Sequence, residues 1–457
     1  MSDVPFVIPL SSARAADVEC VGPKAANLAA LARAGLPTPG GFCLDAEAYR
    51  LQLDALGLTD KAQRIALADL PDARRLAVDI RLALYQGTIA APVLDALLTA
   101  WRAVAEHDPE KWVPVFGKRS CSTNEMKRDD DSKKSHPALA VVRSSALVED
   151  RAGATFAGQF ESFLGLATET DFLTAVRACW AALWTTNARR YMETHEVDAG
   201  ETAMAVLIQP LVEARASGGG LSRTGQDQML LSATWGLGSA IAQGEVVPDR
   251  ILLSRQAFVR KIEPGRKEHS AGCVRGHGEV AAPVDRALVA KPCLEHGQAT
   301  QLGRMLRKAE DVLGIPVEIE WALDDSGFKL LQARPLHVEP ATVPDEIWLR
   351  HPGLNGHPAG IGWGTGRSCV VNCECELSRV APGDVLVTKV AGPSLSYVLP
   401  RVAGVVAELG GSTSHLASLA RERGIPMVLG VLDATRQIPD GVPVAVDGVA
   451  GVVRWMR

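Results

Sequence analysis

The chain has 457 residues, which is enough for about two to four domains that each bury a core. Its composition of 47% hydrophobic and 22% charged residues is ordinary for a soluble globular protein. A net charge of −5 and an aromatic content of 5% argue against a nucleic-acid-binding surface. The first residues lack the basic and apolar regions of a signal peptide, and no apolar run approaches the roughly 18 residues of a membrane span. We therefore expect a cytoplasmic protein that contacts neither nucleic acid nor a membrane.

Nine cysteines are scattered along the chain, and an odd number without a paired framework predicts reduced thiols. Cys369, Cys373 and Cys375 form the one cluster. Zinc sites usually combine Cys-x-x-Cys pairs with a second pair or with histidines, and no such partner set is evident. The alternation of residues here favours a strand and its exit, with metal binding as the alternative.

The first chemical signal is Lys24, where a loop gives way to an alanine-rich helix. Leu28 and Leu31 fall on the buried side of this helix, and Gly35 ends it. A lysine behind a glycine at a helix start is a plausible phosphate ligand, although most such lysines are simply solvated. Residues 45–107 are then predicted to be mostly helical.

Residues 117–136 are charged and small polar with almost nothing to bury, so we expect a surface loop; a substrate lid is the alternative. The strong apolar run 138–146 predicts a buried strand that ends with Arg143 and two hydroxyl residues. A small-residue loop with Gly158 follows, and it opens into an apolar segment at Ser162. An arginine at a strand end beside a glycine loop suits a polyphosphate, because a guanidinium can bind two oxygens at once.

A predicted hairpin spans residues 317–335, with its turn at 324–327. Period-two alternation puts Glu318 and Glu320 on one face, and two more polar residues, Gln332 and Arg334, lie together on the partner strand. Antiparallel pairing would bring all four into one patch. Paired carboxylates with an amide oxygen suit Mg²⁺, which prefers oxygen ligands. The alternative is an exposed polar face with compensated charges.

The segment 410–426 begins with two glycines and three hydroxyl residues around His415, and Gly424 ends the predicted helix. Free amides and the positive end of the helix dipole favour an anion there, which suits a phosphoryl group on the imidazole ring. Imidazole is also a competent nucleophile. A capped surface helix with an incidental histidine is the alternative.

This segment resembles the phosphohistidine domain of the phosphoenolpyruvate synthase and pyruvate phosphate dikinase superfamily. The superfamily motif reads Gly-Gly-x-Thr-Ser-His and then Ala-Arg-Glu-x-Gly-Ile-Pro, and His415 falls on the phosphorylated histidine. Motifs of the superfamily's ATP-binding domain are also present: Val-Arg-Ser-Ser-Ala, Phe-Ala-Gly-Gln, Ile-Glu-Trp-Ala and Leu-Gln-x-Arg-Pro. A Gly-Leu-Gly-Glu motif is matched except that Ser239 replaces its glutamate.

The resemblance implies a multidomain chain of mixed α/β and α+β class. Residues 1–337 would form an ATP-grasp-type nucleotide domain with two lobes, approximately 1–200 and 201–337. Residues 338–349, with two prolines, would form a linker. Residues 350–457 would form a small swivelling β/β/α phosphohistidine domain.

The resemblance also assigns site residues, with ATP and Mg²⁺ as cofactors. His415, Thr413 and Arg334 would be catalytic, with Thr413 orienting the imidazole. Glu320 and Gln332 would hold the metal. The ATP-binding residues would be Lys24, Arg143, Gly158, Ser162, Gln209 (beside the adenine), Glu320, Gln332 and Arg334.

In the reaction implied, the β-phosphoryl group of ATP moves to His415, AMP is released, and the domain swivels to an acceptor. The sequence shows no counterpart of the superfamily's pyruvate-binding barrel or of the antibiotic-binding domain of rifampin phosphotransferases. We therefore expect a small-molecule acceptor other than pyruvate, with residues 391–397 as an acceptor-facing or domain-docking loop.

Three alternatives remain. The chain could be a phosphocarrier whose acceptor site lies on a second protein subunit, as in phenylphosphate synthases, or a condensing ligase that acts through a phosphorylated intermediate. A non-catalytic nucleotide-binding module is the third, and the intact set of lysine, arginines, glutamates and histidine argues against it.

Overall fold

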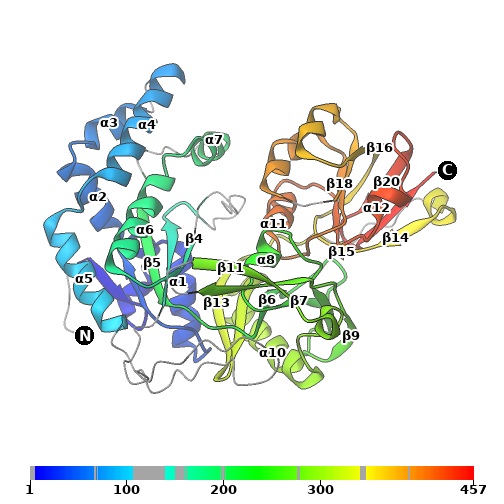
Figure 1. Ribbon diagram of the computed structural model, residues 1–457, viewed down its shortest axis with the longest axis horizontal. Helices are drawn as coiled ribbons and strands as arrows, with labels where there is room; N and C mark the ends of the chain where they lie inside the picture. The colour runs from blue at the N-terminus through cyan, green and yellow to red at the C-terminus, as the bar shows by residue number, and fades with distance from the viewer. Residues whose placement is uncertain are drawn as a thin grey trace, which may run out of the picture.

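The computed structural model describes residues 6–65, 68, 70–105, 139–149, 160, 162–195, 197, 200, 202–274, 278–339, 346–389 and 392–456. The predicted surface loop at 117–136, Gly158, and residues 340–345 of the predicted linker lie outside this set. Figure 1 shows a helical N-terminal lobe on the left, a second lobe below the centre, and a C-terminal domain on the right. The predicted mixed α/β multidomain architecture is confirmed.

The first lobe is an antiparallel sheet of order β1-β2-β5-β3-β4. Its strands are β1 (Val7–Pro9), β2 (Phe42–Leu44), β3 (Ala140–Ala146), β4 (Ser162–Leu166) and β5 (Met204–Pro210), and its helices are α1 (Val18–Arg33), α2 (Ala46–Ala55), α3 (Thr59–Arg64), α4 (Leu70–Gln86), α5 (Ala91–Ala105), α6 (Glu169–Ala182) and α7 (Thr186–Thr194). Along β5, Val206 and Ile208 face the larger helical core, and Leu207 faces α1 on the opposite side. The sheet is therefore covered on both faces. Strand β5 belongs to it although the predicted lobe boundary lies near residue 200.

Helix α1 is broken near its start, and the break positions Lys24. Gly22 has φ 74° and ψ 160°, and Pro23 follows it. A Cβ on Gly22 would lie 2.4 Å from the carbonyl oxygen of Ser145, so the glycine allows the kink to approach the end of β3. The helical turns then begin beside Lys24, as the sequence predicts.

The second lobe is an antiparallel sheet of order β13-β12-β6-β7-β8-β9, packed on helix α10 (His296–Leu313). Its strands are β6 (Ala216–Leu221), β7 (Met229–Trp235), β8 (Asp249–Leu253), β9 (Val259–Glu263), β12 (Val317–Asp324) and β13 (Gly327–Pro335); a separate hairpin, β10 (His269–Val274) with β11 (Gly278–Pro283), and the short helices α8 (Ser239–Ala242) and α9 (Arg286–Val289) complete it. Ile319 and Trp321 of β12 are fully buried in the α10 core. The alternate positions of β12 therefore face away from α10.

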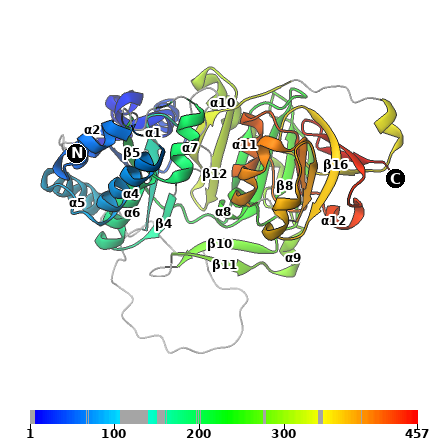
Figure 2. The same ribbon diagram turned by 90° about the horizontal axis from the view of Figure 1, so that it is seen from above.

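The C-terminal domain is built on an eight-stranded sheet of order β14-β21-β20-β16-β17-β18-β19-β15, whose strands β16 to β19 run parallel. Its strands are β14 (Gly353–Asn355), β15 (His357–Pro358), β16 (Trp363–Val371), β17 (Val385–Thr388), β18 (Gly404–Ala407), β19 (Met427–Leu429), β20 (Pro443–Asp447) and β21 (Val452–Trp455), with helices α11 (His415–Glu422) and α12 (Ala434–Gln437) and the 3₁₀ segments η4 (Glu346–Arg350), η5 (Glu374–Arg379), η6 (Pro393–Tyr397) and η7 (Leu399–Arg401). Viewed from above, α11 lies on the side of this domain that faces the second lobe (Figure 2).

The prediction that the cysteines are reduced thiols is wrong at two positions. Cys373 and Cys375 form a disulfide, because the turn into η5 brings their Cα atoms to 5.4 Å, within the range that a disulfide spans. Cys369 stays a free, buried thiol on β16, whose end at Val371 confirms the predicted strand and exit. Within the described ranges, no group of three or more His, Cys, Asp or Glu side chains could hold a metal ion.

No single helix in the described part of the chain is long and apolar enough to cross a membrane. One bent pair, residues 71–86 with 91–103, passes by length and composition alone, and its apolar residues contribute to the core of the first lobe.

Candidate active site

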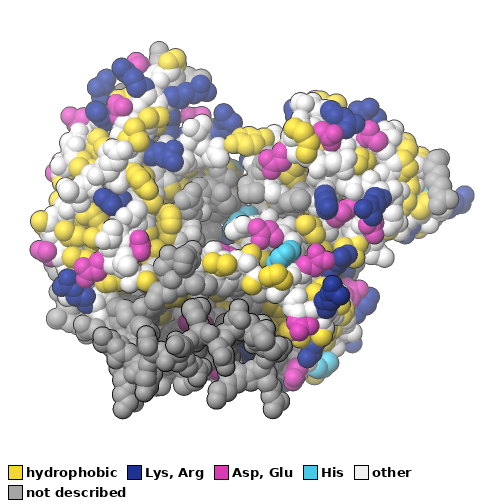
Figure 3. Space-filling model, viewed as in Figure 1, with side chains coloured by type: hydrophobic (Ala, Val, Ile, Leu, Met, Phe, Trp, Pro, Cys, Tyr) yellow, Lys and Arg dark blue, Asp and Glu magenta, His cyan; other side chains and the backbone are white. Residues whose placement is uncertain are grey.

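A cavity of about 420 Å³ lies where the two lobes and the C-terminal domain meet. Figure 3 shows this face of the molecule hollowed between the helical lobe and the C-terminal domain. A volume of this size fits a nucleotide-sized ligand. The polar side chains that line it are Lys24, Arg143, Glu149, Ser162, Gln209, Ser217, Ser239, Gln243, Glu279, Glu320, Gln332, Arg334, Thr413 and His415.

Lys24 projects from the start of α1 into the cavity, next to the end of β3. Its Nζ donates to the carbonyl oxygen of Ser144 at 2.7 Å and to the Glu149 carboxylate at 3.2 Å. Both side chains of this ion pair are at least 90% buried. The carbonyl oxygen and the carboxylate hold the Lys24 ammonium group at the cavity wall, where Glu149 compensates its charge.

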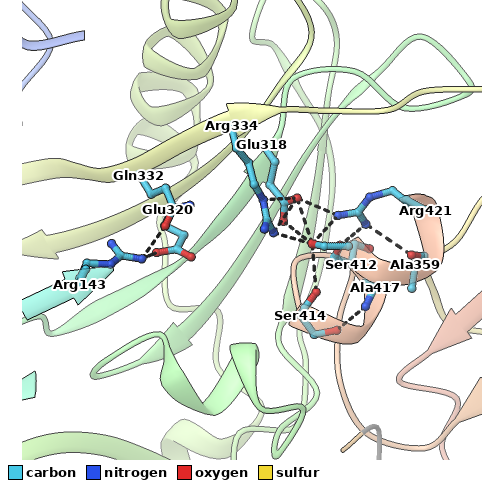
Figure 4. Close-up of polar contacts among 11 residues, drawn as sticks. Arg143, Glu318, Glu320, Gln332, Arg334, Ala359, Ser412, Ser414, Ala417 and Arg421 are labelled. Atoms are coloured by element: carbon cyan, nitrogen blue, oxygen red, sulfur yellow. Dashed lines mark hydrogen bonds and ion pairs between the residues drawn. The ribbon is translucent and has the colours of Figure 1, made fainter. Parts of the chain in front are cut away.

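A second group, which we call the cavity cluster, consists of Arg143, Glu320 and Gln332. The hairpin register pairs Glu320 with Gln332 and Glu318 with Arg334, so the four residues of the predicted patch occupy neighbouring positions of the hairpin. Arg143 reaches across from the first lobe, and its Nη2 donates to the Glu320 carboxylate at 2.8 Å and to the Gln332 amide oxygen at 2.5 Å (Figure 4). Burial raises the pKa of Glu320, but Arg143 beside it outweighs that effect and the pKa falls to about 2. Glu320 is therefore an anion at any physiological pH.

The oxygens of the cavity cluster fit a magnesium ion. Glu320 and Gln332 direct one oxygen each at the same cation, the Arg143 guanidinium. Carboxylate and amide oxygens are the ligands that Mg²⁺ prefers, usually with phosphate oxygens of the nucleotide completing its shell. Glu320 and Gln332 are the residues that would hold this ion.

His415 is the first residue of α11, confirming its predicted place at a helix start. Ser414 is the N-cap, and its hydroxyl accepts the amide of Ala417 at 3.2 Å. The imidazole is open to the cavity, while atoms of both domains surround it. Desolvation lowers the pKa of His415 below its ordinary value, with the cationic Arg334 contributing in the same direction and Glu320 opposing it. The ring is therefore neutral at neutral pH, as a nucleophile must be.

Thr413, which is predicted to orient His415, lies on the cavity wall, and its hydroxyl has no hydrogen-bond partner among the described residues. The reason is packing against the second lobe. A Cβ on Gly219 of β6 would lie 2.5–2.7 Å from three Thr413 side-chain atoms. Thr413 thus packs the loop before His415, the histidine loop, against Gly219 of β6.

A third group, which we call the docking cluster, joins the second lobe to α11: Glu318 and Arg334 from the hairpin, and Ser418 and Arg421 from α11. Glu318 accepts from Arg421 Nη2 at 2.9 Å and from Arg334 Nε at 3.2 Å (Figure 4). Arg334 Nη2 also donates to the Ser418 hydroxyl at 2.5 Å. Burial raises the pKa of Glu318, but the two guanidinium groups outweigh it and hold the pKa below its usual value. Arg334, predicted to contact phosphate, therefore also binds the histidine helix.

Of the remaining predicted residues, Ser162 and Gln209 also line the cavity, and Gly158 lies outside the described residues. Gln209, at the end of β5, donates to the carbonyl oxygen of Gly40 at 3.3 Å. Ser162 on β4 pairs with Arg143 in the sheet register. Ser239, the departure from the superfamily motif, donates to the Glu279 carboxylate of β11, which also lines the cavity.

Sequence reasoning missed Glu149, Glu279, Ser418 and Arg421. Arg421 stands inside the matched motif, so motif position alone could have nominated it. Glu149, Glu279 and Ser418 fall on no fixed position of the quoted motifs and had no such signal.

With this geometry established, comparison with known proteins identifies the family. The model for the pyruvate phosphate dikinase AMP/ATP-binding domain matches residues 18–348, and the model for the mobile domain of PEP-utilising enzymes matches residues 380–451. The chain belongs to the pyruvate phosphate dikinase family.

Phosphoenolpyruvate synthase of Pyrococcus furiosus is 31% identical over 96% of this chain and 57% of its own length. The enzyme of the same name from Pseudomonas aeruginosa is 31% identical over 98% of this chain and 57% of its own length. The chain thus spans a little over half the length of these relatives. A solved structure of Thermococcus kodakaraensis aconitase X covers 23% of the chain at a TM-score of 0.20, too low to establish a shared fold.

Proposed function

We propose that this chain binds magnesium ATP between two ATP-grasp-type lobes and forms a phosphohistidine on His415 from the β-phosphoryl group. The observation that carries the proposal is the shared cavity: His415 comes from one domain, and Lys24, Arg143 and Arg334 come from the other. Cationic groups placed around a transferring phosphoryl group stabilise the charge that spreads over its oxygens. Bound magnesium would neutralise phosphate charge at Glu320 and Gln332.

In this reaction the neutral imidazole supplies a lone pair to the β-phosphorus. The bond from that phosphorus to the oxygen shared with the α-phosphorus breaks, and AMP leaves with the electron pair. The γ-phosphoryl group is then removed, to water as phosphate or to inorganic phosphate as pyrophosphate. The product on the enzyme is phosphohistidine, which is passed to the acceptor.

For the acceptor we propose a small molecule that reaches His415 after α11 leaves the nucleotide site. Delivery to a second protein subunit is the competing proposal. Release of AMP by this chain alone, stimulated by one metabolite, supports the first; a requirement for an added subunit supports the second.

The test is labelling with ATP. Purified chain incubated with magnesium and β-labelled ATP should gain an acid-labile label, γ-labelled ATP should leave none on the final product, and H415A should gain none. The proposal is wrong if H415A releases AMP at the wild-type rate or if the β label never enters the native protein.

A further inference from the structure

Three consecutive residues at the end of α11 have partners in three different parts of the molecule. Arg421 donates to Glu318 of the second lobe at 2.9 Å. Glu422 accepts the hydroxyl of Tyr191, on α7 of the first lobe, and its carboxylate lies 3.4 Å from Nε2 of His195. Arg423 turns back and donates to the carbonyl oxygen of Ser396 in its own domain at 3.3 Å.

Both interdomain contacts are buried. The side chain of Glu422 is 3% exposed and that of Arg421 is 6% exposed. Charged groups are buried to this extent only where hydrogen-bond donors or opposite charges meet them. The contact with the first lobe is extended by the rings of Tyr191 and His195, whose centroids are 4.5 Å apart and whose planes are tilted by 35°. Tyr397 of η6 adds a hydrogen bond to Asn187 of α7 at 3.0 Å.

We propose that Arg421 and Glu422 form an interlobe clamp. When the C-terminal domain docks, Arg421 binds the second lobe and Glu422 binds the first, and docking draws the two lobes together around the nucleotide. The two residues act on the reaction by positioning His415 and the lobes, without touching substrate. The inference rests on the proposed function, since the clamp serves catalysis only if His415 accepts a phosphoryl group.

A thermodynamic consequence follows from the same contacts. Arg143 of the first lobe reaches Glu320 and Gln332 of the second, so the lobes meet across the cavity as well as at α11. A nucleotide in the cavity touches both lobes and favours the same closed arrangement as docking. Because linkage is reciprocal, docking must raise nucleotide affinity by the factor by which nucleotide favours docking.

The test compares R421Q and E422Q with R423Q, the matched neighbour whose contact stays inside its own domain. In the full chain we measure three quantities: the affinity for a non-transferable ATP analogue with Mg²⁺, the radius of gyration by X-ray scattering with and without that analogue, and the single-turnover rate of His415 labelling at saturating β-labelled ATP. We expect R421Q and E422Q to weaken analogue binding about fivefold, to stay expanded with analogue bound, and to lower the labelling rate about tenfold. R423Q should match the wild type in all three.

A variant on the first-lobe side of the interface distinguishes loss of the clamp from a local disturbance of the C-terminal domain. Arg421 also donates to the carbonyl oxygens of Ser412 and Ala359, so R421Q disturbs the histidine loop as well. Y191F removes the hydroxyl that donates to Glu422 and leaves the sequence of the C-terminal domain unchanged. It should change analogue affinity, radius of gyration and labelling rate in the same direction as E422Q. The clamp is wrong if E422Q and Y191F both match R423Q in analogue affinity and labelling rate. If the wild type gains no label, the proposed function fails, while analogue affinity and scattering still decide the clamp.

Discussion

Glu318 and Glu320 lie two residues apart on the same face of β12, yet they serve different regions of the molecule. Glu320 belongs to the cavity cluster, and its side chain is 40% exposed to the cavity. Glu318 belongs to the docking cluster, where Arg334 and Arg421 leave its side chain 6% exposed. The strand presents two equal carboxylates, and the position of α11 decides which one stays open to ligand. The cavity cluster and the docking cluster therefore draw on adjacent positions of one hairpin.

The substitution E320Q should distinguish the two regions most clearly, because it should lower the labelling rate without changing docking. This change removes the anion that would hold magnesium, and leaves the docking cluster intact. We expect the single-turnover labelling rate of His415 to fall about 100-fold, the order seen when one electrostatic group is lost from an active site. X-ray scattering should show an unchanged docked shape. An expanded shape would contradict the division into two regions.

E318Q should act through docking, with a smaller effect on rate. Glutamine leaves Arg334 and Arg421 close together without their shared anion, and breaking a buried pair of this kind costs about 2 kcal/mol or more. We expect a labelling rate lower by about 30-fold together with an increased radius of gyration. If E318Q lowers the labelling rate while docking stays complete, Glu318 acts with the cavity cluster and the division into two regions is wrong.

G219A probes the docking site without changing any charge. Its new Cβ would meet Thr413 atoms at 2.5–2.7 Å, so the histidine loop must shift or undock. We expect the labelling rate to fall about tenfold, with the thermal midpoint of unfolding close to the wild-type value. If G219A labels His415 at the wild-type rate, the histidine loop does not dock on β6 during transfer.

The smallest expected effect is on the pH profile. The pKa of His415 lies below its ordinary value, and the negative charge of Glu320 partly opposes that lowering. Removing that charge lowers the pKa of His415 further, so the acid limb of the labelling rate should move to lower pH in E320Q and move less in E318Q. Glu320 itself, with a pKa of about 2, does not titrate in this window. Rates measured between about pH 5 and 7 test the sign, and an acid limb displaced upward in E320Q would contradict it.

Much of the site could be predicted because its signals are local. Alternation along residues 317–335 predicted that the two glutamates share a face of the hairpin with Gln332 and Arg334, and the hydroxyl residues before His415 with the glycine at 424 predicted both ends of its helix. The register shift after Glu320 had no sequence signal, because it depends on how β12 packs between its two neighbours. The disulfide between Cys373 and Cys375 was missed because their spacing does not reveal the turn into η5 that brings their Cα atoms to 5.4 Å.

The sequence by itself determined which residues could handle phosphate and where the nucleophilic histidine stands on its helix. These properties follow from side-chain chemistry and from local sequence patterns, namely the alternation of a strand and the capping residues of a helix. Only the tertiary structure decided what each charged residue faces: Glu320 the cavity, Glu318 the histidine helix, Arg421 the second lobe and Glu422 the first. The reason is that these partners lie on separate bodies, and their meeting depends on how the bodies dock rather than on any spacing along the chain.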